Sequence, residues 1–304
     1  MFDYSYWPPT QKQFFFPQSI SFVDFIIDFY KPYKLKAKIG WFFFLHSKWI
    51  QNKFLISENE IPIPFGELKS VLSNYNIPFF YFLINLGTPG VEQKISIIII
   101  DQNLEKIAVI KLAQNSVPKS LIENENRWLS KIASDSFNVP KLILYEKKSN
   151  FDILVLSYLE GMKLPYNPCS PKIIKIIKSI IALSKIEEKK DLQYTFAHGD
   201  FCPWNILVDS NNKYSLIDWE MAGEYPLGYD LFTFIFQTYF LVSARSPYQL
   251  LRKNQNIITE FFASYEIHDW EPYLKEFCFI KMSKKNIIEQ KTLFNKYKKL
   301  HNLL

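Results

Sequence analysis

Cysteine and glycine are scarce in this sequence, and each shortage narrows the kinds of protein that it can encode. The three cysteines stand far apart with no Cys-x-x-Cys pair, which argues against a disulfide framework and a cysteine-based zinc site. Only 8 glycines occur among 304 residues, so each is more informative than usual, because glycine is favoured where the backbone excludes a side chain. Six of them fall in or beside the segments discussed below: Gly87, Gly90, Gly161, Gly199, Gly223 and Gly228.

Long hydrophobic runs and blocks of like charge are also missing. The longest apolar run, LFTFIFQTYFLV (231–242), is well short of the ~20 residues that a membrane span needs. The first residues, MFDYSYWPPTQKQ, lack the basic region and apolar core of a signal peptide. The net charge of +6 is modest and its basic residues are dispersed, so we expect no nucleic-acid partner. A cytoplasmic protein without a membrane span is therefore expected, and its oligomeric state stays open.

Ile-, Phe- and Val-rich runs, separated by short turn-like segments, predict an antiparallel sheet. Helical patterns follow them, so an α+β protein is expected. The expected strands are 79–87, 94–101, 105–113, 141–146 and 152–159, with one helix at 116–134. Further helices are expected at 170–186, 227–243, 246–266 and, with a break, 270–300. We therefore divide the chain into an N-terminal extension of unclear role (1–78), a sheet lobe (79–160) and a helical lobe (161–304).

The extension carries no recognisable chemistry. Short amphipathic helices are predicted at 19–30 and 66–76. Between them, GWFFFLHSKWI and QNKFLI are interpreted as strands or buried loop, because aromatic and β-branched residues favour strands.

Polar groups gather in one stretch, AHGDFCPWNILVDSNNKYSLIDWEMAG (197–223). Asp200 follows His198 by two residues, and Asn205 follows Asp200 by five. An aspartate on such a loop can orient an acceptor hydroxyl and receive its proton. The runs at 206–208 and 214–217 flank a turn-rich insert and predict a hairpin that returns Asp218 to Asn205. A carboxylate and an amide oxygen that converge there would suit Mg²⁺.

The segments HGDFCPWN and LIDWE resemble the motifs of the aminoglycoside phosphotransferase and choline kinase superfamily, which consists of small-molecule relatives of the protein kinases. The resemblance extends over about residues 80–265 and implies a bilobal, protein-kinase-like fold. It implies that Asp200 is the catalytic base and that Asn205 and Asp218 hold magnesium. It also implies that Lys111 binds the phosphates and pairs with Glu125, with Glu123 as the alternative partner.

The same resemblance places a nucleotide, ATP or GTP, as phosphoryl donor. Its phosphates would lie in a cradle of Gly87, Thr88 and Gly90, and its base near Ser157 and Leu159. Here the sequence departs from the family pattern, because NLGTPGVEQK is no Gly-x-Gly-x-x-Gly loop and Pro89 has no N–H for a phosphate.

A second departure distinguishes the subfamilies. Gly199 stands where protein kinases carry an arginine that binds a phosphorylated activation loop. Eleven residues separate Asp218 from Asp230, too few for a protein-kinase activation segment. A small-molecule acceptor is favoured.

Neighbouring residues are expected to have structural roles. His198 would hold its loop by a hydrogen bond, Trp204 and Trp219 would pack, and Cys202 would be a small buried residue. For Asp230, the cap of the following helix is preferred over a functional role.

The acceptor stays open among a sugar, a glycoconjugate precursor, an amino alcohol and an aminoglycoside. From Ala222 to Leu304 there are 8 acidic and 11 basic residues, a net +3, which disfavours a polycationic aminoglycoside. A catalytically silent nucleotide- or ligand-binding protein is the main alternative. A third hypothesis is RNA binding through the lysine-rich C-terminus, which salt-dependent binding to arbitrary RNA would reveal.

Overall fold

The computed structural model describes residues 3–8, 11–18, 35–165, 169–243, 245–284, 287 and 290–304. The chain divides into two compact units, of which the first comprises Met1–Ile122 and Lys141–Tyr158. The second comprises Glu123–Pro140 and Leu159–Leu304. The helix predicted at 19–30 lies outside the described residues.

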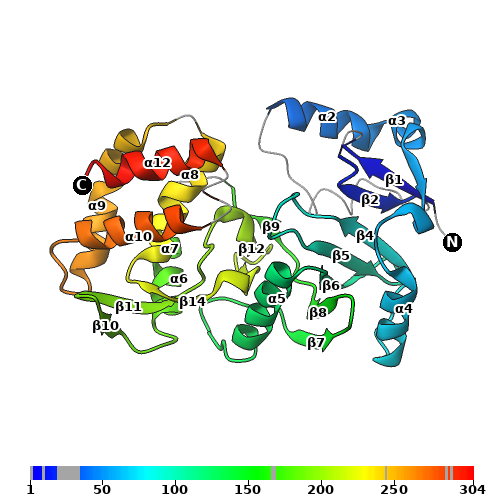
Figure 1. Ribbon diagram of the computed structural model, residues 1–304, viewed down its shortest axis with the longest axis horizontal. Helices are drawn as coiled ribbons and strands as arrows, with labels where there is room; N and C mark the ends of the chain where they lie inside the picture. The colour runs from blue at the N-terminus through cyan, green and yellow to red at the C-terminus, as the bar shows by residue number, and fades with distance from the viewer. Residues whose placement is uncertain are drawn as a thin grey trace. The chain divides into compact units, whose positions relative to one another are not determined.

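The first unit is built on an eight-stranded sheet with the order β3-β1-β2-β4-β5-β6-β8-β7, in which every neighbouring pair is antiparallel (Figure 1). All five predicted strands are confirmed: β4 (Tyr81–Asn85), β5 (Ile95–Ile100), β6 (Lys106–Ala113), β7 (Leu142–Lys147) and β8 (Asp152–Ser157). The extension adds three more: β1 (Asp3–Trp7), β2 (Phe14–Pro17) and β3 (Leu55–Ser57). The extension is thus continuous with the sheet, since Phe14 and Phe15 of β2 pair with Asn85 and Ile84 of β4.

The interpretation of GWFFFLHSKWI as strand or loop is wrong, because this stretch is helical. It forms most of α2 (Leu35–His46) and the start of α3 (Lys48–Lys53). Trp41, Phe44 and Leu45 are buried, and this i, i+3, i+4 spacing places them on one helix face. That face packs with Phe14 and Phe16 of β2 in one hydrophobic cluster. Tertiary packing thus overrides the strand preference of the aromatic residues.

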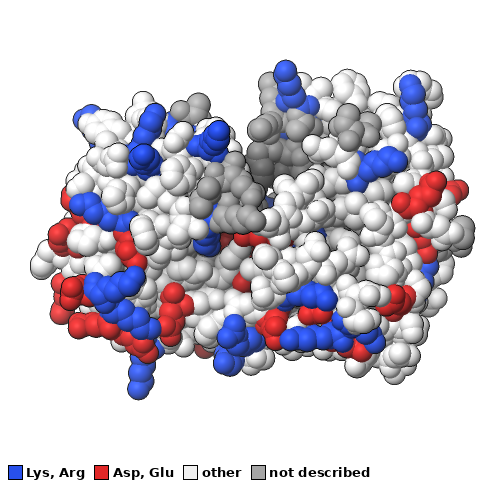
Figure 2. Space-filling model, viewed as in Figure 1, with Lys and Arg blue, Asp and Glu red and all other residues white. Residues whose placement is uncertain are grey.

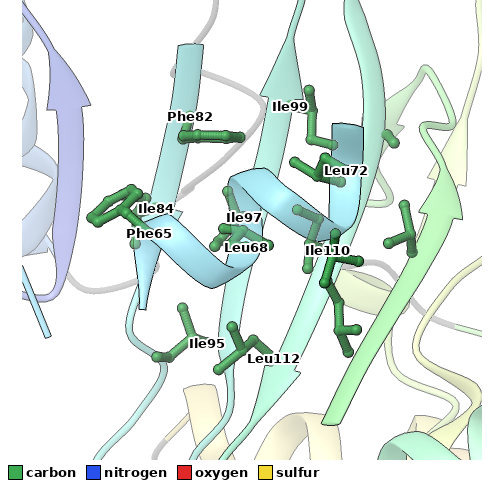
Figure 3. Close-up of a cluster of buried hydrophobic side chains, with 14 of the residues drawn as sticks. Phe65, Leu68, Leu72, Phe82, Ile84, Ile95, Ile97, Ile99, Ile110 and Leu112 are labelled. Atoms are coloured by element: carbon green, nitrogen blue, oxygen red, sulfur yellow. The ribbon is translucent and has the colours of Figure 1, made fainter. Parts of the chain in front are cut away.

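Helix α4 (Phe65–Asn74) confirms the helix predicted at 66–76 and covers a core cluster of the sheet (Figure 3). Its Leu68 and Leu72 are fully buried, among strand residues that include Ile97 and Ile110. The cluster also contains Tyr4 of β1, so the extension shares the core of the sheet. Each fully buried side chain of this size stabilises the fold by about 1.5–3 kcal/mol.

The second unit is mostly helical, as predicted. Helix α5 (Ser116–Leu129) runs from the first unit into the second. The remaining α-helices are α6 (Pro171–Ile181), α7 (Tyr229–Phe232), α8 (Thr238–Val242), α9 (Pro247–Ala263), α10 (Glu271–Ser283) and α12 (Lys291–His301). A π-helical segment, η4 (Thr233–Gln237), joins α7 to α8. Short 3₁₀ turns occur at η1 (Glu58–Glu60) in the first unit and at η2 (Pro203–Asn205) and η3 (Trp219–Met221) in the second.

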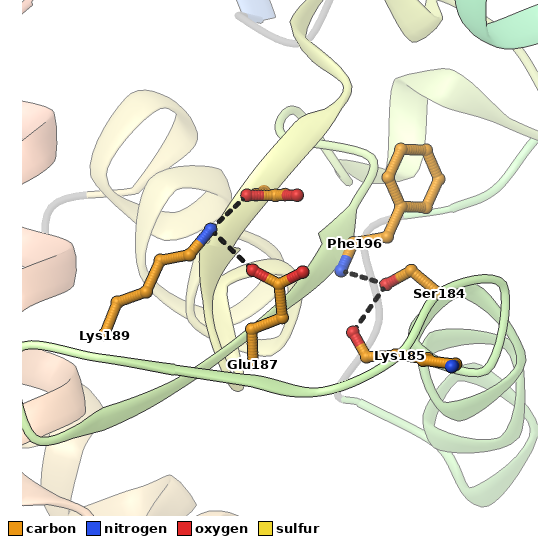
Figure 4. Close-up of polar contacts among 6 residues, drawn as sticks. Ser184, Lys185, Glu187, Lys189 and Phe196 are labelled. Carbon is orange, nitrogen blue, oxygen red and sulfur yellow. Dashed lines mark hydrogen bonds and ion pairs between the residues drawn. The ribbon is translucent and has the colours of Figure 1, made fainter.

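Two three-stranded sheets support the helices of the second unit. One has the order β10-β11-β14 and contains β10 (Glu187–Lys189), β11 (Leu192–Ala197) and β14 (Gly223–Pro226). The other has the order β13-β12-β9 and contains β9 (Met162–Lys163), β12 (Ile206–Val208) and β13 (Tyr214–Leu216). At β10, Lys189 pairs with Glu187 at 2.9 Å, and the nearby hydroxyl of Ser184 accepts from the Phe196 backbone N–H at 3.0 Å (Figure 4). This exposed ion pair contributes little to the stability of the sheet, because surface pairs contribute about 0–1 kcal/mol.

Among the described residues, no helix is both long and apolar enough to span a bilayer. On the face seen in Figure 2, basic and acidic side chains of the described residues lie together in the lower part of the view, whereas the upper edge carries basic side chains.

Candidate functional site

The predicted hairpin is confirmed and joins the two ends of the polar segment. Ile206 of β12 pairs with Leu216 of β13, and the Ile217 N–H donates to the Asn205 carbonyl at 3.0 Å. Asn205 Nδ2 donates to the Asp200 carbonyl at 2.9 Å and to Asp200 Oδ2 at 3.0 Å. Because Nδ2 faces Asp200, Asn205 Oδ1 is the atom left for a cation. The structure therefore brings Asp200 and Asn205 into direct contact.

His198 holds the loop, as the sequence predicts. It is fully buried, its Nε2 lies 3.0 Å from the Ile217 carbonyl, and its Nδ1 accepts from the Asp200 N–H at 3.3 Å. A ring nitrogen that faces a carbonyl must donate, so this geometry assigns the neutral tautomer with the proton on Nε2.

Gly199 is required by the backbone. Its φ is +81°, and a Cβ at this position would lie 2.0 Å from the Met221 carbonyl oxygen. Any side chain would displace the loop. This close approach gives a physical reason for the absence of the protein-kinase arginine here.

Asp230 is not the cap of the following helix, and that prediction is wrong. Gly228 occupies the N-cap position of α7 and Asp230 lies inside the helix. The buried Asp230 carboxylate accepts from the backbone N–H groups of His198 at 2.7 Å and Gly199 at 3.0 Å. Burial raises the pKa of Asp230, while the hydrogen bonds from the His198 and Gly199 backbone N–H groups oppose the shift. Asp230 thus fixes the loop that carries Asp200.

Asp218 lies in a strained conformation beside two further carboxylates. Its φ of 70° and ψ of 57° are left-handed, a conformation that non-glycine residues seldom adopt outside special sites. Ligand atoms of Asp218, Glu125 and Glu220 all lie within 4.8 Å of one another. Glu125 Oε1 also accepts from the Trp219 N–H at 3.2 Å, which ties α5 to this turn. Sequence analysis missed Glu220, although the spacing Asp-x-Glu in LIDWE was a usable signal.

These oxygens fit a magnesium ion. Mg²⁺ binds hard oxygen ligands at ~2.0–2.1 Å, so opposite ligands lie about 4.2 Å apart. Three ligand atoms within 4.8 Å of one another could fill three of the six octahedral positions of one ion after small shifts. The sequence did not predict Glu220 as a ligand. The predicted ligand Asn205 is joined to this turn by the hydrogen bond from the Ile217 N–H to the Asn205 carbonyl.

Lys163 of β9 is a cation beside the cluster. Burial lowers the pKa of Lys163, and the charge of Asp218 opposes that shift. The position of Lys163 follows from β9, which pairs Lys163 with Leu207 of β12. Sequence analysis did not single it out.

Several candidates lie in the first unit. Lys111 is buried in β6 between Ser96 of β5 and Leu154 of β8. Ser157 ends β8, and its hydroxyl accepts from the Lys141 N–H at 2.9 Å. Leu159 and Glu125 belong to the second unit. The alternative Glu123 lies two residues before Glu125 in α5.

The candidate phosphate loop follows β4. Gly87 has φ +77°, and a Cβ there would lie 2.4 Å from the Lys94 carbonyl oxygen. The Gly87 N–H already donates to Asn85 Oδ1 at 2.9 Å. Thr88 and Gly90 are exposed. With Pro89 lacking an N–H, this loop offers few backbone donors in the conformation described.

Cys202 and Trp219 have the structural roles predicted for them. Cys202 is fully buried, and burial raises the pKa of its thiol, which disfavours a nucleophilic role. Trp219 is fully buried and stacks on Phe196, with the ring centroids 6.2 Å apart. The centroids of the Trp219 and His198 rings lie 4.5 Å apart.

Comparison with known proteins supports the interpretation of the central segment. Residues 168–256 match the model of the family described as "Phosphotransferase enzyme family". No curated protein sequence gives a significant match.

Two solved structures are similar in part. Aminoglycoside phosphotransferase APH(3'')-Id from Streptomyces rimosus ATCC10970 is 12% identical, with 79% of this chain and 99% of that chain covered and a TM-score of 0.48. The co-crystal structure of WbdD and the kinase inhibitor LY294002 is 14% identical, with 74% of this chain and 46% of that chain covered and a TM-score of 0.33. The family match contains Asp200, Asn205 and Asp218, so this part of the chain is similar to the APH phosphotransferase family.

Proposed function

We propose that the protein transfers the γ-phosphoryl group of a magnesium-bound nucleotide, ATP or GTP, to a hydroxyl of a small molecule. The observation that carries the proposal is the arrangement of Asp200, Asn205 and Asp218 inside the segment that matches the phosphotransferase family. Function has to be argued from such a site, because one fold serves many activities.

Asp200 would orient the acceptor hydroxyl and take its proton as the new bond to phosphorus forms. The bond between the γ-phosphorus and the β–γ bridging oxygen breaks, and the nucleoside diphosphate leaves. Asn205 hydrogen-bonds the Asp200 carboxylate at 3.0 Å, so the base is held before substrate binds.

Asn205 and Asp218 would hold the magnesium ion, and Glu220 is added to this set by its position in the carboxylate cluster. When bound, the ion would neutralise negative charge on the transferring group. Lys111, oriented by Glu125, would bind the α- and β-phosphates. Gly87, Thr88 and Gly90 would cover the phosphates, and Ser157 and Leu159 would lie near the purine base of the nucleotide.

A small, non-polycationic acceptor is the class that the charge of the helical region supports. The net +3 between Ala222 and Leu304 would repel an aminoglycoside, whereas a sugar, a glycoconjugate precursor or an amino alcohol carries less positive charge.

One observation favours a second candidate, a nucleotide-binding protein that has lost transfer. The phosphate loop has Pro89 in it and its Gly87 N–H is bonded to Asn85, so its grip on phosphate would be weak. This candidate predicts magnesium-dependent nucleotide binding without turnover.

Thermal melts with Mg-ATP and with Mg-GTP test nucleotide binding. A ligand at ~100 times its Kd should stabilise the protein by ~2.7 kcal/mol, which raises the midpoint by several degrees. We expect the shift to disappear with EDTA and in Asp218→Asn, and to persist in Asp135→Asn, which replaces an exposed aspartate of the same unit. Absence of a shift with both nucleotides in the wild type would contradict both candidates.

A further inference from the structure

Gln237 is a polar residue at the end of a largely buried π-helical segment, η4. A π turn accommodates an extra residue in a helix and is frequent at functional sites. The Gln237 amide lies against the loop that carries Asp200: its Nε2 is 2.5 Å from Asp200 Oδ1 and 3.6 Å from Cys202 Sγ. Gln237 therefore contacts Oδ1 of the proposed catalytic base, whereas Asn205 contacts Oδ2.

Lys281 of α10 contacts the other end of the same amide. Its Nζ lies 2.5 Å from Gln237 Oε1. The Asp200 carboxylate only accepts, so Nε2 must face Asp200, and Oε1 is left to accept from Lys281. Without Lys281 this oxygen would lose its partner, and the amide would be held through its Nε2 contacts with Asp200 and Cys202.

The burial of Lys281 needs an explanation. Its side chain is 2% exposed, and its ammonium lies 4.8 Å from the centre of the Tyr229 ring and 5.4 Å from that of Phe277. A buried charge is costly, and apolar replacements of buried charges are often as stable or more stable. Stability alone therefore gives little reason for a lysine at this position.

The groups around Lys281 balance its charge only in part. Burial lowers the pKa of Lys281 to about 7, and Lys284 contributes in the same direction. Asp200, Cys202 and Asp230, from the loop and from α7, oppose the shift.

The two oxygens of Asp200 are unequally engaged. Oδ1 accepts from Gln237 Nε2 and from the Cys202 thiol at 3.7 Å, whereas Oδ2 accepts from Asn205 Nδ2. Each carboxylate oxygen offers two lone pairs, so Oδ2 keeps one for an acceptor hydroxyl.

We propose that Gln237 and Lys281 are positioning residues for the reaction: Lys281 fixes the orientation of the Gln237 amide, and Gln237 fixes Asp200 so that Oδ2 faces the acceptor. The proposal rests on the function proposed above. It adds a support from Lys281 of α10, which lies 81 residues after Asp200 in the chain.

A double-mutant cycle on turnover tests the coupling. Hydrolysis of Mg-nucleotide, with water as the acceptor, is measured for Gln237→Leu, Lys281→Met, the double variant and the matched control Lys275→Met on the same helix. We expect each of the two single variants to lower kcat about 10- to 100-fold, because small misplacements of a reacting group cost this much. The KM for the nucleotide should change little. The double variant should be no slower than the slower single variant, because both act through one contact.

Multiplied losses in the double variant, or a loss confined to KM, would overturn the proposal and leave the proposed function standing. Thermal melts of all variants ensure that the comparison is made between folded proteins. Turnover of the control should match the wild type.

A readout that needs no activity separates the two proposals. The side-chain NH₂ resonances of Gln237 in ¹⁵N spectra are assigned by their loss in Gln237→Leu. We expect them to move in Lys281→Met and in Asp200→Asn and to stay in place in Lys275→Met. Absence of movement would overturn the positioning proposal, even if the wild type turns over nucleotide. Absence of wild-type turnover with these movements intact would refute the proposed function and leave only the contact from Lys281 through Gln237 to Asp200.

Discussion

The two sides of Asp200 differ in where their residues come from. On one side, Asn205 and Asp218 are close in sequence, and a short hairpin brings them together. On the other side, Asp230, Gln237 and Lys281 come from helices 30 to 81 residues further along the chain. The first side holds the residues proposed to act on the substrate, and the second contacts Asp200, the proposed base, and its loop. The proposed site residues are thus close in sequence, whereas the residues that contact Asp200 and its loop from the other side come together only in the tertiary fold.

The largest effect on the supporting side is expected for Asp230→Ala. It would leave the buried N–H groups of His198 and Gly199 without their acceptor, at about 1–3 kcal/mol each. We therefore expect a loss of about 2–6 kcal/mol in the free energy of unfolding, measured by urea denaturation, together with loss of turnover. A variant with unchanged stability would show that the loop does not depend on this support. Asp209→Ala serves as a control, since its side chain accepts two backbone N–H groups in an exposed turn.

A smaller effect is expected when the loop itself is altered. Gly199→Ala puts a Cβ against the Met221 carbonyl in a left-handed conformation, which alone costs about 1–2 kcal/mol. We expect the midpoint of thermal unfolding to fall by several degrees and kcat to drop. Gly66→Ala, with open space around its Cβ position in α4, should leave both unchanged or raise the midpoint slightly. Equal behaviour of the two variants would contradict the close approach at Gly199.

The smallest effect concerns the pH dependence of stability at Lys281. Its pKa is about 7 in the folded protein against an ordinary value of 10.5, so the unfolded chain binds more protons between these values. The contribution of Lys281 to stability should therefore increase as the pH rises from 7 to 10.5. We expect the midpoint of the wild type to rise relative to that of Lys281→Met over this range, as measured by paired melts. A constant difference between the two proteins would contradict a buried, shifted Lys281.

Most of the sheet and the hairpin could be predicted because their signals are local. Ile-, Phe- and Val-rich runs separated by turn-like segments predicted β4 to β8, and the turn-rich DSNNK insert predicted the hairpin. Helix α2 was missed because strand propensity suggested extended chain, whereas burial of Trp41, Phe44 and Leu45 against β2 decided for helix.

The supporting residues could not be predicted for a different reason. Asp230 had the ordinary appearance of a helix cap, and its actual partners are backbone groups that no spacing rule relates to it. Gln237 ends an apolar run that has no other sign of a site. Lys281 lies in a lysine-containing helix, where a lysine usually faces solvent. Only the packing of α7, η4 and α10 assigns them to the site.

The most direct test of the central claim is turnover of Mg-nucleotide by Asp200→Asn beside the wild type and the control Asp135→Asn. A general base contributes about 10²- to 10⁴-fold, so kcat should fall at least 100-fold in Asp200→Asn. The magnesium-dependent thermal shift should remain, because Asp200 is not placed among the metal ligands. Wild-type turnover in Asp200→Asn would contradict the account of this site.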